Sequence, residues 1–101
     1  MYELIKVIAE IELFIGKNML QTPIYNKYQP IFCFEDTRIN ISGRIDLINM
    51  ESLAPGLSGI VQVTFIKGMI SDEYFEEGVT FTISEGGGYD LGKGKIIELL
   101  N

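Results

Sequence analysis

The residue types that most often carry catalysis are nearly absent from this sequence. The chain has no histidine, so neither a Ser-His-Asp nor a Cys-His arrangement can be built, and zinc lacks its usual nitrogen ligand. The one cysteine, Cys33, lies between Phe32 and Phe34, and neither neighbour carries the positive charge that activates a thiolate. We therefore predict a structural cysteine, no catalytic residue, no metal site and a protein that is not an enzyme.

Two other stretches come close to ligand-binding segments without completing them. The acidic run 72–77 lacks the alternating ligands and the turn glycine of a calcium loop, so a solvated loop is favoured. Residues 87–94 approach the phosphate-binding loop pattern, but Gly94 replaces the hydroxyl that binds magnesium. Residues 96–99 then look like a strand, whereas a phosphate loop opens a helix. The sequence predicts no nucleotide and no cofactor.

The charge balance and the composition limit the class of protein. Lysine and arginine total 8 against 14 aspartate and glutamate, a formal net charge of −6, which disfavours strong RNA binding because that affinity comes largely from neutralised phosphates. A hydrophobic fraction of 47% in 101 residues predicts one folded domain, 1–101. The N-terminus does not resemble a signal peptide and no apolar run reaches the roughly 20 residues of a membrane span. We expect a cytoplasmic protein with no membrane partner.

Alternating polar and apolar residues dominate the chain. Val7, Ala9, Ile11 and Leu13 fall on one face of a first strand, and similar alternation recurs between turns. Most of these predicted turns are rich in glycine or proline, and one is at Asn26-Lys27. Only 71–77 suggests a short helical turn. We predict an all-β fold, a small closed or partly open antiparallel barrel of about six strands. Gly43 interrupts a β-branched strand, which indicates a bulge or a sharp barrel corner.

Five landmarks occur in order along this body: Thr22-Pro23, the run Tyr-Gln-Pro-Ile-Phe-Cys-Phe at 28–34, Ser42-Gly43, Pro55-Gly56 and Glu85-Gly86-Gly87. In order and spacing they resemble the third, C-terminal β-barrel domain of elongation factor Tu, where the matching stretches read Thr-Pro, Tyr-Arg-Pro-Gln-Phe-Tyr-Phe, Thr-Gly, Pro-Gly and Glu-Gly-Gly. The similarity extends over nearly the whole chain. No stretch resembles the GTPase domain or the second barrel of that factor.

In that family the barrel helps hold the T-stem of aminoacyl-tRNA, packs on the GTPase domain and meets the nucleotide-exchange factor. Carried over position by position, the resemblance implies RNA contacts at Ser42, Gly43, Lys67, Glu85 and Gly86.

The cationic and amide side chains of the family are largely replaced, however. Its Arg-His before Thr-Pro is Leu20-Gln21 here, and its Arg-Pro-Gln is Gln29-Pro30-Ile31. The arginines beside its Glu-Gly-Gly are Ser84 and Gly88. Structural retention of the glycine framework is therefore favoured over RNA contact.

The leading hypothesis is a non-catalytic module that binds a protein partner, such as a translation factor, a GTPase or a product of the same locus. Aromatic residues in or beside predicted loops are its candidate anchors: Tyr25, Tyr28, Tyr74 and Tyr89. Two alternatives stay open, a tRNA-binding accessory protein and a decoy of the elongation factor's third domain. Pairing of two chains through an exposed strand edge also stays open.

Overall fold

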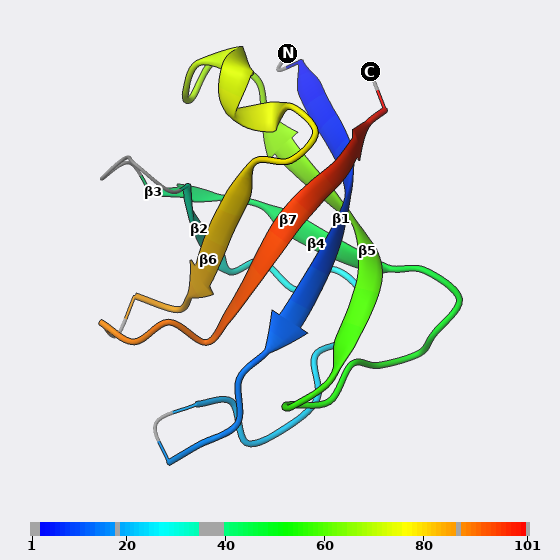
Figure 1. The fold of residues 1–101 in the computed structure, drawn as a ribbon, viewed down its shortest axis with the longest axis vertical. Helices are drawn as coiled ribbons and strands as arrows, with labels where there is room; N and C mark the ends of the chain where they lie inside the picture. Colours follow the sequence, from blue (N-terminus) through cyan, green and yellow to red (C-terminus); the bar gives the residue numbers. More distant parts are fainter. Residues whose placement is uncertain (1–2, 18, 35–39, 87, 101) are drawn as a thin grey trace.

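The computed structural model describes residues 3–17, 19–34, 40–86 and 88–100. Their order is β1 (Leu4–Leu13), β2 (Ile31–Phe34), β3 (Asn40–Ser42), β4 (Arg44–Leu47), β5 (Ser58–Ile66), the 3-10 turn η1 (Asp72–Phe75), β6 (Thr80–Ser84) and β7 (Gly92–Leu99). The strands form one antiparallel sheet in the order β3-β2-β6-β7-β1-β5-β4. The sheet curls strongly around its inner face, so the predicted all-β fold with a small barrel is confirmed (Figure 1).

The sheet curls back on itself because its two outermost strands are consecutive in the chain. β3 pairs with β2 and β4 pairs with β5, and only Gly43 separates them. Tyr28, which precedes β2 in the chain, forms an antiparallel bridge with Ile45 of β4 and so extends this pairing past Gly43. Residues 40–47 thus behave as one strand bent at Gly43, the corner that the sequence predicted. Counted in this way, the described strands number six, in line with the predicted barrel.

The inner face holds the core. Alternate residues of β1, from Ile5 to Leu13, are buried, as the period-two pattern predicted. Five phenylalanines pack around one another at the centre: Phe32, Phe34, Phe65, Phe75 and Phe81. The Phe32 and Phe65 rings meet edge to face at 5.0 Å between centroids, a favoured aromatic geometry. Strands near the two ends of the sheet order, β2 and β5, therefore meet in the core.

The connections agree with the turn signals. η1 is the short helical turn predicted within 71–77, and its Phe75 is buried against the core. Residues 92–99 form β7, so a strand and not a helix follows the glycine-rich segment that approaches a phosphate loop. Gly86 and Gly88 have φ of +86° and +84°, a conformation that favours glycine, while Gly87 lies outside the described residues. These glycines serve the turn from β6 to β7.

Candidate functional site

A hollow lies at the end of the barrel where β6 stops. Its volume is about 390 Å³, and it joins the segment 20–28 to Glu85, which directly follows β6. Several sequence landmarks that are far apart in the chain meet here. The lining consists of Leu20, Thr22, Pro23, Ile24, Tyr25, Asn26, Lys27, Tyr28 and Glu85. We call it the Tyr28 hollow.

Backbone hydrogen bonds hold the segment that forms one wall of this hollow. Ile24 exchanges two such bonds with Leu53, at 2.9 and 3.0 Å. The Lys27 amide donates to the Ile45 carbonyl at 2.9 Å, and the Ile45 amide donates to the Tyr28 carbonyl at 2.7 Å. The wall is therefore an extension of the sheet and not a free loop.

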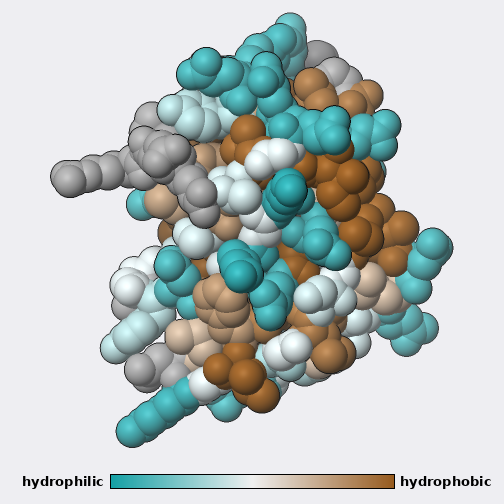
Figure 2. All heavy atoms as spheres, in the orientation of Figure 1, coloured by the Kyte–Doolittle hydropathy of each residue, from teal (hydrophilic) through white to brown (hydrophobic). Residues whose placement is uncertain are grey.

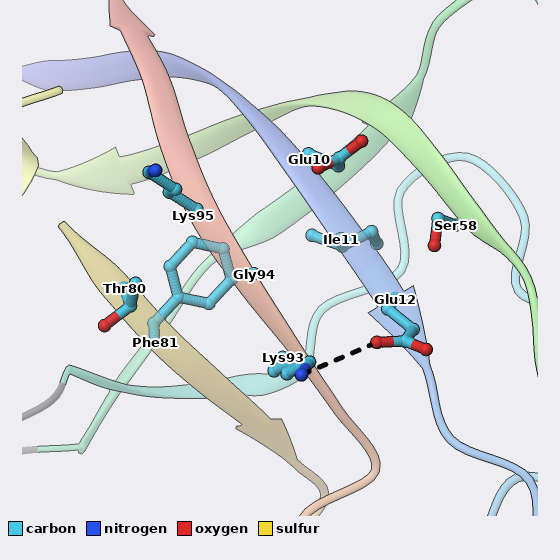
Figure 3. Close-up of a pocket in the computed structure, with 9 residues that line it drawn as sticks. All are labelled: Glu10, Ile11, Glu12, Ser58, Thr80, Phe81, Lys93, Gly94 and Lys95. Carbon is cyan, nitrogen blue, oxygen red and sulfur yellow. Dashed lines mark ion pairs between the residues drawn. The ribbon is translucent and has the colours of Figure 1, made fainter. Parts of the chain in front are cut away.

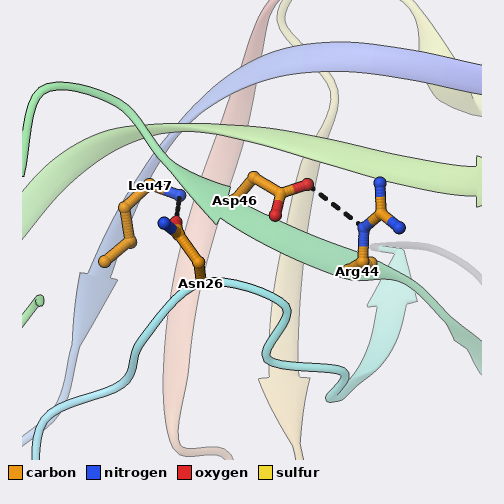
Figure 4. A network of polar contacts seen from close by, with 4 residues as sticks. All are labelled: Asn26, Arg44, Asp46 and Leu47. Carbon is orange, nitrogen blue, oxygen red and sulfur yellow. Dashed lines mark hydrogen bonds and ion pairs between the residues drawn. The ribbon is translucent and has the colours of Figure 1, made fainter. Parts of the chain in front are cut away.

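A hydrogen bond to a side chain also holds this wall segment. The Leu47 amide, at the end of β4, donates to the Oδ1 of Asn26 at 2.6 Å (Figure 4). Asn26 precedes Lys27, whose φ of 70° closes a turn in which the Tyr28 amide donates to the Tyr25 carbonyl at 3.3 Å. The turn predicted at Asn26-Lys27 is confirmed. It fixes the backbone of Tyr25, whose side chain is 61% exposed.

The polar centre of the hollow is the pair Tyr28 and Glu85. Burial, and then the negative charge of Glu85, raise the pKa of the Tyr28 hydroxyl well above its usual range. The Tyr28 Oη is buried and has no fully formed hydrogen bond within the described residues, although Glu85 lies near enough to oppose its ionisation. Tyr28 therefore stays protonated at neutral pH and can donate a hydrogen bond, but not act as a base.

The outer face of β3, β2 and β6 continues from this hollow. Ile31 stands opposite Ser42 on one side and Ser84 on the other. A Cβ placed on Gly86 would lie 3.6 Å from Ile31 Cδ1, an ordinary contact, so this glycine borders the same row. Ser42 and the pair Glu85-Gly86 thus share one surface, centred on Ile31.

Gly43 has a different role from Ser42. Its missing side chain would point into the core, between the rings of Phe32 and Phe65. The neighbouring Arg44 is occupied by an ion pair from its Nε to Asp46 Oδ2 at 3.1 Å (Figure 4). A shallow hollow of about 200 Å³ borders both Ser42 and Arg44, and it also includes Gln29 and Thr64.

The remaining predicted contact residues lie elsewhere. Lys67 follows β5 near η1, at the other end of β6, and its Nζ pairs with Glu3 at 3.5 Å and Asp72 at 3.9 Å. Tyr74 is half-buried and packs on Phe34, with 6.1 Å between ring centroids. Tyr89 is 52% exposed in the turn before β7. Of the predicted residues, the structure gathers Tyr25, Tyr28 and Glu85 in the Tyr28 hollow, and Ser42 and Gly43 in the hollow of about 200 Å³.

Asn26 and Lys27 belong to the site but were expected only to mark a turn. The sequence offered one signal for their place in the site: the Asn26-Lys27 turn lies between Thr22-Pro23 and the run that begins at Tyr28. No sequence pattern pairs Asn26 with Leu47, because the two residues are joined only by the curl of the sheet.

The side chains that line the Tyr28 hollow offer hydrogen-bonding groups, apolar contacts and one charge of each sign, Lys27 and Glu85. Across the described ranges, no group of three or more Cys, Asp or Glu is arranged to hold a metal ion. In the same part of the chain, no helix is long and apolar enough to cross a bilayer. No protein-family model matches the sequence. The site is defined by its own geometry alone.

Proposed function

We propose that this protein is a non-catalytic binding module, similar to the third domain of elongation factor Tu, that binds a protein partner at the Tyr28 hollow. The exposed Tyr25 beside a hollow with fixed walls is the observation that carries the proposal. An aromatic residue next to a preformed pocket is the typical anchor of a protein interface, because it buries much area and loses little entropy. A translation factor, a GTPase or a product of the same locus fits this proposal, as does a cytoplasmic setting.

The charge of the site favours protein over RNA. Lys27 is the one cation among the residues that line the Tyr28 hollow, and Glu85 offsets it. RNA affinity instead requires several unpaired cations beside the phosphates. The nearby Arg44 is already paired with Asp46. A neutral, partly aromatic surface supports a polypeptide ligand.

Affinity capture from the host lysate with nuclease treatment tests the proposal. Wild type should retain a nuclease-resistant protein, Tyr25→Ala should lose it, and Met69→Ala should keep it. Met69 is a matched control because it is equally exposed, at 60%, in the turn after β5. With the purified partner, Tyr25→Ala should weaken binding about 30-fold, the effect of an anchor worth roughly 2 kcal/mol. Equal retention by both variants would reject the site.

The tRNA alternative has one observation in its favour, the common surface of Ser42, Ile31 and Glu85-Gly86. It predicts salt-sensitive tRNA binding that weakens when Glu85 or Ser42 is replaced. Absence of binding at low salt, where phosphate contacts are strongest, would eliminate it.

The decoy alternative predicts instead that a toxin or exchange factor binds this protein and elongation factor Tu competitively.

A further inference from the structure

The outer face of β7, β1 and β5 carries an apolar zone, none of whose members lines the Tyr28 hollow. Its members are Leu4 (44% exposed), Ile60 (37%), Ile66 (39%), Ile97 (41%) and the half-buried Ile8. Leu4 and Ile66 are direct cross-strand partners, and Ile97 is the extra residue of the β-bulge beside Ile8. Figure 2 shows hydrophobic residues gathered along the side where β1 and β5 lie in Figure 1. Such a patch on a small protein commonly marks an interface.

A charged zone adjoins it on the same face. Glu10 and Glu12 project from β1, and Lys95 and Lys93 project from the paired positions of β7 (Figure 3). These four residues line a hollow of about 320 Å³. The Lys93 Nζ lies 3.8 Å from Glu12 Oε1, while Glu10 and Lys95 form no ion pair within the described residues. We call these four residues the charge ladder.

The two zones together are self-complementary. Consider a two-fold axis that runs along the strands, between β1 and β7, in the plane of contact. It places the β1 of one copy over the β7 of the other, so that Glu10 faces Lys95, Glu12 faces Lys93 and Ile8 faces the bulge that Ile97 and Glu98 form. An interface between identical copies requires this reciprocity, in which each contact occurs twice. Like charges would meet if β1 instead lay over β1 and β7 over β7, because both acids are on β1 and both bases are on β7.

We propose that this face binds a second copy of the chain, forming a symmetric dimer that leaves the Tyr28 hollow free. The occupant follows from the charges. The protein carries −6 overall, yet the ladder has two acids and two bases, so two acidic molecules meet here without like-charge contact. A purely acidic partner would place like charges against Glu10 and Glu12, and a purely basic partner would place them against Lys93 and Lys95. Because the barrel face is convex, the contact is small and the dimer is expected to be weak.

The test is the mass of the full chain in solution as a function of concentration, by analytical ultracentrifugation. The wild type should rise from 11.4 kDa toward twice that mass. Ile97→Glu should stay monomeric, whereas Ile15→Glu, a change at a 79% exposed residue after β1, should dimerise as the wild type does. Tyr25→Ala should also dimerise normally, which separates this proposal from the proposed function.

Two charge-reversed variants make the test specific to a second copy. E10K/E12K has an all-basic ladder and K93E/K95E an all-acidic one, so each alone should be monomeric. Mixed in equal amounts, they should form a heterodimer. E73K/E76K, in and beside η1 and away from the ladder, gives the same change in net charge as E10K/E12K and should dimerise alone. A wild type that stays monomeric up to about 1 mM would overturn the proposal. A mixture that stays monomeric while the wild type dimerises would do the same.

Discussion

Gly43 lies directly against the ring of Phe32. A Cβ on Gly43 would meet Phe32 Cε1 at 2.7 Å and Phe65 Cε1 at the same distance. At the bend between β3 and β4, the backbone of Gly43 therefore fills the space between the rings of Phe32 and Phe65. The absence of a side chain at this position is what lets one strand pair with both β2 and β5.

Replacing this glycine should destabilise the fold. We expect Gly43→Ala to lower the free energy of unfolding by about 1–3 kcal/mol, because the rings of Phe32 and Phe65 must move to admit a methyl group. A urea titration followed by circular dichroism measures the change. Gly59→Ala is the matched control, since the nearest atoms to its new methyl would be the ends of two aliphatic side chains, Met50 Cε at 2.9 Å and Leu53 Cδ1 at 3.3 Å, and not two core rings. Equal loss in both variants would contradict the role of the bend.

The environment of Tyr28 predicts an unusual titration at alkaline pH. Burial and the charge of Glu85 raise the pKa of this hydroxyl, so the difference in tyrosinate absorbance between wild type and Tyr28→Phe should appear above the ordinary tyrosine range. Glu85→Gln should lower the pKa of Tyr28 only in part, because burial is the larger cause. A Tyr28 transition near pH 10, or one unaffected by Glu85→Gln, would contradict this account.

The same shift has a consequence for stability. The pKa of Tyr28 is higher in the folded state than in the unfolded state, so unfolded chains lose the proton first as the pH rises. The contribution to stability is complete below about pH 10 and is lost as the pH climbs toward the folded pKa. Tyr28→Phe should flatten this alkaline decline in urea midpoints. An unchanged slope in Tyr28→Phe would assign the decline to other groups.

The hydrogen bond from the Leu47 amide to Asn26 predicts a local loss of stability when Asn26 is replaced. Asn26→Ala leaves the Leu47 amide without its acceptor and should cost about 1 kcal/mol, because this amide then relies on water. Asn26→Asp keeps an oxygen at the same place and should retain most of the stability. Thermal unfolding compares the two variants. Hydrogen exchange of the Leu47 amide gives a local measurement. Unchanged protection of this amide in Asn26→Ala would contradict a role for the hydrogen bond.

The sequence predicted the barrel better than the site. Strand faces such as Val7 to Leu13 follow from local alternation, and the bend follows from a single glycine in a β-branched strand. Contacts between distant segments do not follow from such patterns. Nothing in the sequence shows that Tyr74 would pack on Phe34, or that Lys67 would pair with Glu3 and Asp72 at the end remote from Glu85.

The Ile31 surface allows a test of the inherited RNA role by restoring what the resemblance says is missing. Gln29 is exposed and Ile31 is half-buried beside Ser42 and Gly86, so Q29R/I31Q should be accommodated without rebuilding the core. If this surface keeps the scaffold of a tRNA site and lacks only its cation and amide, the double variant should bind tRNA more tightly at low salt. One added phosphate contact should also steepen the salt dependence by about 0.7–0.9 in slope.

A matched variant separates a specific gain from one of charge alone. Met69→Arg adds one positive charge at an exposed position in the turn after β5, remote from Glu85. It should raise tRNA affinity less than Q29R/I31Q does, because it has no Ser42, Gly86 or Glu85 beside it to position a backbone. Filter binding over a range of salt concentrations compares the two. An equal gain in both variants would mean that the Ile31 surface has no geometry suited to RNA, which would leave the protein-binding proposal as the stronger account of this end of the barrel.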